Sequence, residues 1–391
     1  VQRIYRQILT ANENANVTVA TSKSQVSALH NQLGPDIGIS IEPCRRDTFP
    51  AIALACAYLH DIQKVGAQEV VIICPVDPYV GQEYFAALKE LENIVRRDKD
   101  LNLALMGIQP TYPSEKYGYI IPKTREKISE VIKFKEKPTV EAAQRYIRSG
   151  ALWNGGVFAF RLGYMLQRAH ELLGVSDYKH LYQKYDTLEK ISFDYAVVEH
   201  EKRIEVLRFS GDWKDLGTWN TLTEAMEEDV AGDGILSSSC KNTQIINELD
   251  IPVLGMGLKD IIVAASPDGI LVADKAECSY LKDYADVFSR QVMYAEKSWG
   301  TYKVIDIEEA GMTIKITLKA GQKMNYHSHE HRTEVWNVIS GMGRTVIDGA
   351  EQEVAGGHVA VLPAGCRHML IADTDMQVIE IQIGREISVH D

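Results

Sequence analysis

Residues 69–98 have the sequence EVVIICPVDPYVGQEYFAALKELENIVRRD, which runs from an apolar β-rich segment through a turn into a segment with helical periodicity. A second apolar run, LNLALMGI at 101–108, follows directly. Such apolar runs are typical of strands whose two faces are both covered by helices. The alternation continues from residue 17 to about 210 and predicts an α/β domain with a mainly parallel sheet. Ligands are expected at the carboxyl ends of these strands.

Two changes of pattern divide the rest of the chain. The polar, glycine-bearing VAGDG at 230–234 is followed only by short β-like runs with Asp-Gly and Asn turns. From residue 296 to the end, repeated short strands with glycine turns and no convincing helix are typical of a β-barrel or sandwich. We therefore expect three domains, at 1–229, 230–290 and 291–391.

Composition excludes several classes of function. At 391 residues the chain is longer than one hydrophobic core usually serves. The formal net charge of -12 and the absence of a basic block argue against a nucleic-acid or membrane partner. The six cysteines are widely spaced without a C-x-x-C pair, as expected of reduced thiols. With no membrane-length apolar run and no signal peptide, we expect a cytoplasmic protein.

A histidine-rich stretch, GQKMNYHSHEHRTEVWNVISG, occupies residues 321–341. On a strand, His327 and His329 would share a face, and a turn after them could return Glu334 to the same place. An H-x-H alone fits a solvated or core histidine pair better than a metal site. The stretch GHVAVLPAGCRH at 357–368 adds a second spacing, and together the two resemble both signature motifs of the cupin family.

The cupin resemblance implies a β-barrel whose interior binds a divalent metal. Carried over by position, its ligands are His327, His329, Glu334 and His368. Three imidazole nitrogens and one carboxylate suit Zn, Fe, Mn, Ni or Co, so the identity of the metal stays open. His331 is left over, and its ordinary role would be that of a turn residue.

Two aspartates follow predicted strands of the α/β segment. Asp77 comes just after the apolar run EVVIICP, and Asp215 lies in FSGDWKDLGTWNTL, just past the run RIEVLRF at 203–209. Two carboxylates that converge from separate loops can hold Mg²⁺ and so neutralise and orient phosphates. For either aspartate alone, a helix N-cap or turn role is the simpler interpretation.

Most of the chain resembles one family, the mannose-1-phosphate guanylyltransferases that carry an appended cupin-type mannose-6-phosphate isomerase domain. The matching stretches are EPCRRDTFPAIALA, PVDPYV, YGYIIP, FKEKPTVEAAQRYIRSGALWNGGVFAF, SFDYAVVE, WKDLGTW, KSWGTYKVID and the two cupin motifs. The resemblance implies a Rossmann-like nucleotidyltransferase domain, a small linking β module and a C-terminal cupin. It also implies transfer of GMP from GTP to mannose 1-phosphate, giving GDP-mannose and pyrophosphate, in a homodimer.

The resemblance assigns roles by position. Asp77 and Asp215 would bind Mg²⁺, and Lys137, the third catalytic residue, would contact the phosphate. The substrate-binding residues would be Arg46, Asp47 and Thr48 on the nucleotide side, and Gly118, Tyr119, Glu136 and Asn154 on the sugar side. The cupin would hold a divalent transition metal, Zn or similar, and interconvert mannose 6-phosphate and fructose 6-phosphate.

Some features depart from the family. The first strand and the Gly-rich loop that holds the triphosphate are not found, so we expect them in a longer protein. Asp47 stands where the family usually has Asn, which puts the choice of nucleotide in doubt, and His327 stands where Gln is common. The alternative is a non-catalytic sugar-nucleotide-binding protein whose cupin serves binding or dimerisation.

Overall fold

The computed structural model describes residues 1–281, 284 and 292–384. The chain divides into two compact units, Val1–Leu216 and Gly217–Asp391. The three-domain division expected from the sequence therefore stays a proposal. Among the described helices, none combines the length and the apolar character needed to cross a membrane.

The main sheet of the first unit is mixed. Its strand order is β3 (Val70–Ile73), β8 (Leu152–Arg161), β5 (Leu103–Ile108), β9 (Ile204–Phe209), β7 (Ile128–Lys135), β6 (Tyr119–Pro122). Among the described residues β5 and β9 form its parallel pair, and its other pairs are antiparallel. The sheet is thus mixed rather than mainly parallel, because β8 inserts antiparallel between β3 and β5 and because β6 and β7 form a hairpin. β6 also pairs with β8. The strands β8, β5, β9, β7 and β6 therefore form a closed ring of strand pairings.

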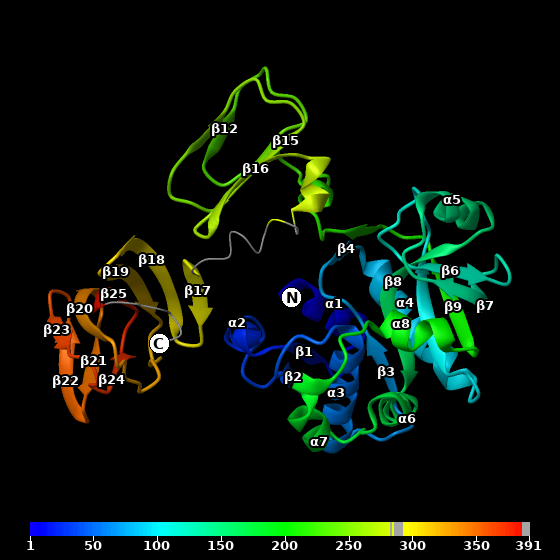
Figure 1. The fold of residues 1–391 in the computed structure, drawn as a ribbon, viewed down its shortest axis with the longest axis horizontal. Helices are drawn as coiled ribbons and strands as arrows, with labels where there is room; N and C mark the ends of the chain where they lie inside the picture. The colour runs from blue at the N-terminus through cyan, green and yellow to red at the C-terminus, as the bar shows by residue number, and fades with distance from the viewer. Residues whose placement is uncertain (282–283, 285–291, 385–391) are drawn as a thin grey trace. The chain divides into compact units, whose positions relative to one another are not determined.

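Helices cover both faces of this sheet, as the apolar strands predicted (Figure 1). Leu103 and Leu105 of β5 pack into a core with α3 (Thr48–Asp61) and α6 (Leu162–Leu173). The alternate residues Ala104 and Met106 pack with α4 (Gln82–Arg97) on the other face. α4 is amphipathic, and its buried positions recur at helical spacing: Tyr84, Phe85, Leu88, Leu91, Ile94 and Val95.

The remaining elements of the first unit surround this sheet. β1 pairs in parallel with β2, and β4 pairs antiparallel with β10. Their bounds, with those of the other helices, are α1 (Gln2–Ala11), β1 (Thr18–Ser22), α2 (Val26–Leu33), β2 (Gly38–Glu42), β4 (Pro78–Val80), α5 (Val140–Arg148), α7 (Tyr178–Gln183), α8 (Phe193–Ala196), η3 (Val198–His200) and β10 (Trp213–Asp215).

The second unit begins with α9 (Trp219–Thr223) and a small β module. One sheet has the order β11 (Val230–Ala231), β13 (Gln244–Asn247), β15 (Ile261–Ser266), β16 (Gly269–Asp274). β12 (Gly234–Leu236) pairs in parallel with β14 (Val253–Gly255). The β module predicted for this part of the chain is therefore present.

The rest of the second unit forms the expected β domain from two sheets. The larger has the order β17 (Tyr294–Lys297), β18 (Gly300–Glu308), β19 (Gly311–Leu318), β25 (Met376–Gly384), β20 (Arg332–Ser340), β23 (Val359–Leu362). The smaller has the order β22 (Ala350–Ala355), β21 (Met342–Ile347), β24 (His368–Ala372). A separate apolar core lies inside this domain and includes Ile314, Trp336 and Leu370.

Replacing Leu103 by alanine should lower the free energy of unfolding of the first unit by about 2–5 kcal/mol, because a cavity would remain in a packed core. Leu103 is 0% exposed, whereas Leu172 on α6 is 50% exposed and supplies the control Leu172→Ala. The control should change stability by at most about 0.5 kcal/mol. Urea denaturation of the whole chain, followed by far-UV circular dichroism, measures both. Equal losses would contradict the placement of β5 in the core.

Candidate functional site

The pairing of β4 with β10 brings the two predicted Mg²⁺ ligands to neighbouring positions. Asp215 lies opposite Pro78 in this ladder, and Asp77 is the residue directly before Pro78. Asp77 is exposed and Asp215 is half-buried. The Tyr117 hydroxyl donates to Asp215 Oδ2 at 3.2 Å. Burial and then the charge of Asp215 raise the pKa of Tyr117, which keeps this donor protonated.

An aromatic cluster lies beside Asp215. The ring of Tyr117 lies 4.9 Å from that of Trp153 and 5.7 Å from that of Trp213, measured between centroids. Trp153 Nε1 donates to the Tyr119 hydroxyl at 3.0 Å, and Tyr119 is 0% exposed. The Tyr119 side chain is therefore part of the packing, as is Trp153. Its predicted contact with a sugar would have to come from its backbone.

The predicted sugar-side residues meet where three strands begin or end. Glu136 and Lys137 directly follow β7, Gly118 directly precedes β6, and Asn154 lies on β8. The backbone N–H of Asn154 donates to the backbone carbonyl of Gly118 at 2.8 Å. A Cβ on Gly118 would press against Glu136 Oε2 and lie 2.8 Å from the Phe134 ring, so this position has no room for a side chain.

Two carboxylates in this cluster are held in a low-polarity environment. Burial, and next the charge of Asp194, raise the pKa of Glu136 to about 7, against a smaller lowering by Lys137. Burial likewise raises the pKa of Asp194 to about 6. Asn154 Nδ2 donates to Asp194 Oδ1 at 2.6 Å, and Lys137 Nζ lies 3.6 Å from Glu136 Oε1. Glu136 Oε2 is buried and has no hydrogen-bond partner in the described part of the chain.

Asp194 is a member of this cluster that the sequence analysis did not single out. It lies in the first turn of α8, where the Ser192 hydroxyl accepts from the Tyr195 amide and caps the helix. In the sequence, SFDYAVVE at 192–199 is counted only among the stretches that resemble the family, and none of its residues is assigned to a site. A signal was present, because a serine cap followed by an acidic residue marks a helix N-terminus at which a carboxylate is favoured.

The three predicted nucleotide-side residues lie at the start of α3. Asp47 Oδ1 accepts from the Thr48 amide at 2.8 Å, and Thr48 Oγ1 accepts from the Phe193 amide at 2.8 Å. Arg46 donates from its guanidinium to the backbone carbonyls of Tyr185 and Asp186. The Thr48 bond joins the start of α3 to the start of α8, next to Asp194.

Backbone strain marks both sides of this cluster. Asp47 has φ of 68° and ψ of −177°, and Lys137 has φ of 42°. Residues other than glycine rarely adopt these conformations, which cost about 1–3 kcal/mol each and occur preferentially at ligand-binding sites. Asp47 is predicted on the nucleotide side and Lys137 on the phosphate, and four further non-glycine residues of the described ranges also have positive φ.

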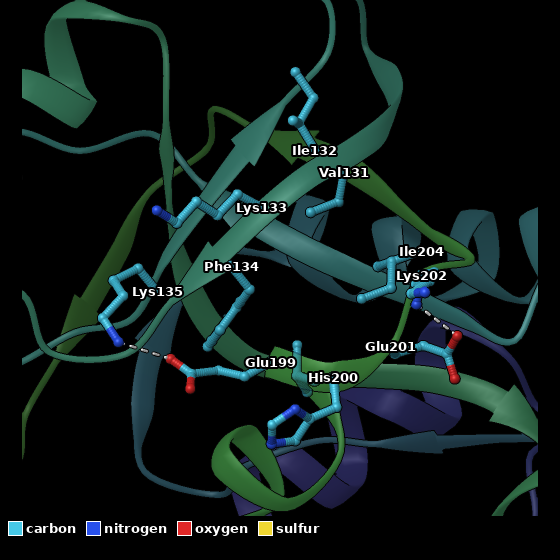
Figure 2. A pocket seen from close by; sticks show the side chains of 11 residues that line it. Val131, Ile132, Lys133, Phe134, Lys135, Glu199, His200, Glu201, Lys202 and Ile204 are labelled. Atoms are coloured by element: carbon cyan, nitrogen blue, oxygen red, sulfur yellow. Dashed lines mark hydrogen bonds and ion pairs between the residues drawn. The ribbon is translucent and has the colours of Figure 1, made fainter.

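A groove of about 710 Å³ lies between β7 and the segment from η3 to β9 (Figure 2). Glu199 in its wall pairs with Lys135 at 3.3 Å, drawn as a dashed line in Figure 2. Glu199 Oε1 also accepts from the Glu136 backbone N–H at 3.2 Å. None of the predicted site residues lines this groove. Through Glu199, the wall of the groove instead fixes the backbone of Glu136.

The β domain of the second unit brings its three predicted histidine ligands together. Ligand atoms of His327, His329 and His368 lie within 4.8 Å of one another, so the three could bind a metal. The strand expected to carry His327 and His329 is not formed. A single bridge to His368 positions His327 instead. The Nδ1 atoms of His327 and His368 face the carbonyls of Asn325 at 2.6 Å and Cys366 at 3.0 Å, which leaves their Nε2 atoms as acceptors.

Glu334 completes the predicted ligand set from β20. Its Oε1 lies 3.2 Å from His329 Nε2, and its Oε2 lies 3.3 Å from His368 Nε2. Glu334 Oε2 and His368 Nε2 are buried and lack a hydrogen-bond partner among the described residues. Burial, the largest cause, lowers the pKa of His329 to about 4, so its imidazole is neutral. The neutral imidazole of His329 and the buried acceptors without partners fit a divalent metal.

Comparison with known proteins agrees with this arrangement. Residues 2–232 match the nucleotidyl transferase family, and residues 286–391 match the C-terminal family of mannose-6-phosphate isomerase. A Salmonella typhimurium mannose-1-phosphate guanylyltransferase, RfbM, is 28% identical over 98% of this chain and 85% of its own length. The mannose-1-phosphate guanylyltransferase of Escherichia coli strain K12 is 26% identical over 98% of this chain and 86% of its own.

A solved structure adds the fold. The crystal structure described as mannose-1-phosphate geranyltransferase from Thermus thermophilus superposes with a TM-score of 0.61. It is 27% identical and covers 74% of this chain and 89% of its own. Because the first family covers more than half of the chain and the relatives span nearly all of it, the chain belongs to the mannose-1-phosphate guanylyltransferase family of nucleotidyl transferases that carry a C-terminal mannose-6-phosphate isomerase (cupin) domain.

Proposed function

We propose that this protein transfers GMP from GTP to mannose 1-phosphate and releases pyrophosphate. The observation that carries the proposal is the register of β4 with β10, which sets Asp77 beside Asp215. Mg²⁺ bound by such a pair would neutralise charge on the phosphates. In the reaction an oxygen of the sugar phosphate bonds to the α-phosphorus of GTP, and the bond from that phosphorus to pyrophosphate breaks. The names of the curated relatives support the same substrates.

The residues around the predicted sugar site suit this chemistry. The reaction needs positive charge and positioning more than a proton donor or acceptor. Lys137 would orient the phosphate of the sugar, and Glu136, an acceptor when ionised, would bind sugar hydroxyls. Asn154 would present an amide whose orientation is fixed by its bond to Asp194. Arg46, Asp47 and Thr48 would lie on the side of the nucleotide.

A second activity is proposed for the cupin, the interconversion of mannose 6-phosphate and fructose 6-phosphate. The orphaned buried atoms of Glu334 and His368 support a resident metal, Zn or a similar transition metal. Such a metal would polarise the carbonyl of the sugar when bound. The homodimer and the cytoplasmic location stay predictions.

Asp77→Asn and Asp215→Asn should each reduce pyrophosphate release from GTP and mannose 1-phosphate by roughly a hundredfold or more, because each removes a charge from the same predicted Mg²⁺ site. The control is Asp212→Asn, an exposed aspartate directly before β10, which should keep the rate of the wild type. The assay is run on the full-length protein with saturating Mg²⁺. A rate near that of the wild type in either variant would contradict the assignment.

Stability without substrates should fall as the pH rises from about 4 to 7. The reason is that burial raises the folded-state pKa of Glu136 to about 7 and that of Asp194 to about 6, so the folded chain binds more protons than the unfolded chain. Glu136→Gln should flatten this dependence in thermal melts at pH 5 and pH 8. The control Glu130→Gln, at an exposed position on β7, should leave it unchanged. Identical profiles for Glu136→Gln and the wild type would refute the burial of this charge.

The purified protein should carry about one equivalent of transition metal, and the double variant His327→Ala, His329→Ala should lose it, because two ligands are removed. His331→Ala should keep the metal, since His331 is exposed and lies outside the cluster. Elemental analysis measures the metal content. The double variant should also lose isomerase activity while pyrophosphate release continues. Loss of both activities would show that the two are coupled.

A further inference from the structure

The centre of the cupin contains a cation of its own. Arg332, the first residue of β20, is 6% exposed. Its Nε donates to Glu334 Oε1 at 2.8 Å, and its Nη2 lies 2.8 Å from His329 Nε2. An arginine is rarely buried this deeply unless its charge and its N–H groups are paired. Here both of these partners are predicted ligands of the metal.

The hydrogen-bonding chemistry fixes what each partner contributes. A guanidinium has N–H donors and no acceptor, so at 2.8 Å from His329 Nε2 it must donate to the lone pair of that nitrogen. A metal would need the same lone pair. The same holds for Glu334 Oε1, which accepts from Arg332 Nε. The guanidinium thus occupies two of the atoms that a metal would use.

The other half of the centre is left unsatisfied. Glu334 Oε2 and His368 Nε2 lie 3.3 Å apart, and within the described ranges neither has a hydrogen-bond partner. Arg332 therefore provides hydrogen bonds to His329 Nε2 and Glu334 Oε1 but none to Glu334 Oε2 and His368 Nε2. A metal needs both sides, and its charge would repel a guanidinium that stayed on His329 and Glu334.

We propose that Arg332 competes with the metal for His329 Nε2 and Glu334 Oε1, so that a metal binds only when the guanidinium leaves these two atoms. This inference rests on the proposed metal centre of the cupin. An alternative acceptor is available nearby. Gln382 lies directly opposite Glu334 on β25, and its Oε1 is buried with no hydrogen-bond partner among residues 1–281, 284 and 292–384. Arg332 accordingly sets the affinity of the centre for metal.

Zn²⁺ titrated into the metal-stripped full-length protein tests the competition by calorimetry. Arg332→Met keeps an apolar stem but removes the cation, and its dissociation constant for Zn²⁺ should be about ten- to a hundredfold smaller than that of the wild type, since one charged hydrogen-bonded pair no longer has to break. Arg332→Lys keeps the charge without the planar fork and should lie between them. The control Arg344→Met, on β21, alters a guanidinium paired with Glu351 and Asp373 and should bind like the wild type.

The outcomes separate the inference from the proposed centre. Equal or weaker Zn²⁺ binding by a folded Arg332→Met would overturn the competition alone. Absence of Zn²⁺ binding in the wild type and in every variant would overturn the metal centre and the competition together. Neither result would touch the transferase, which is assayed separately by pyrophosphate release.

A measurement on the unaltered protein covers the case in which Arg332→Met does not fold. With ¹⁵N-labelled arginine, the Nε–H resonance of Arg332 is identified by its absence in Arg332→Lys. This resonance should move with one equivalent of Zn²⁺, while that of Arg344 stays in place. An unmoved Arg332 resonance at full Zn²⁺ occupancy would show that the guanidinium does not leave, and the inference would be wrong.

Discussion

The candidate active site depends on the pairing of one long strand, β8, with three others. β8 pairs with β3 and β5 and also meets β6 at its start. That last pairing holds Asn154 against the Gly118 carbonyl and so fixes the start of β6 beside the end of β7. Without it, the β6–β7 hairpin would be held to the sheet only by the pairing of β7 with β9 at Ile128–Glu130, and Glu136 and Lys137 would lie beyond that pairing. The position of the polar cluster therefore depends on the pairing of β6 with both β7 and β8.

Periodicity in the sequence predicted the class of the fold but not the directions of its strands. Buried apolar runs such as 101–108 report that both faces of a strand are covered, which β5 confirms. They carry no information about whether the neighbouring strand is parallel. That depends on contacts between distant segments, here β8 with β3 and β5. In the cupin, turn chemistry identified the β domain, whereas a single bridge positions His327 in place of the expected strand.

The sites were predictable where residue type and local context coincide. Asp77, directly before β4, was expected from its place after an apolar run, whereas Glu136 and Lys137, directly after β7, were assigned by the family resemblance. For Asp194 the sequence offers only the signal of a helix N-terminus, because its place in the site comes from burial against Asn154 and Glu136, which lie 40 and 58 positions away in the chain. The same limit applies to Arg332, since a charged residue at the start of a strand is ordinarily solvated.

The left-handed backbone at Asp47 and Lys137 has an evolutionary consequence. Glycine adopts such conformations without steric cost, so a single replacement at either position would relieve strain and raise thermal resistance. The same replacement would delete a carboxylate or an ammonium from the cluster. Selection for heat tolerance alone would therefore favour a more stable chain whose site lacks one of these two charged groups.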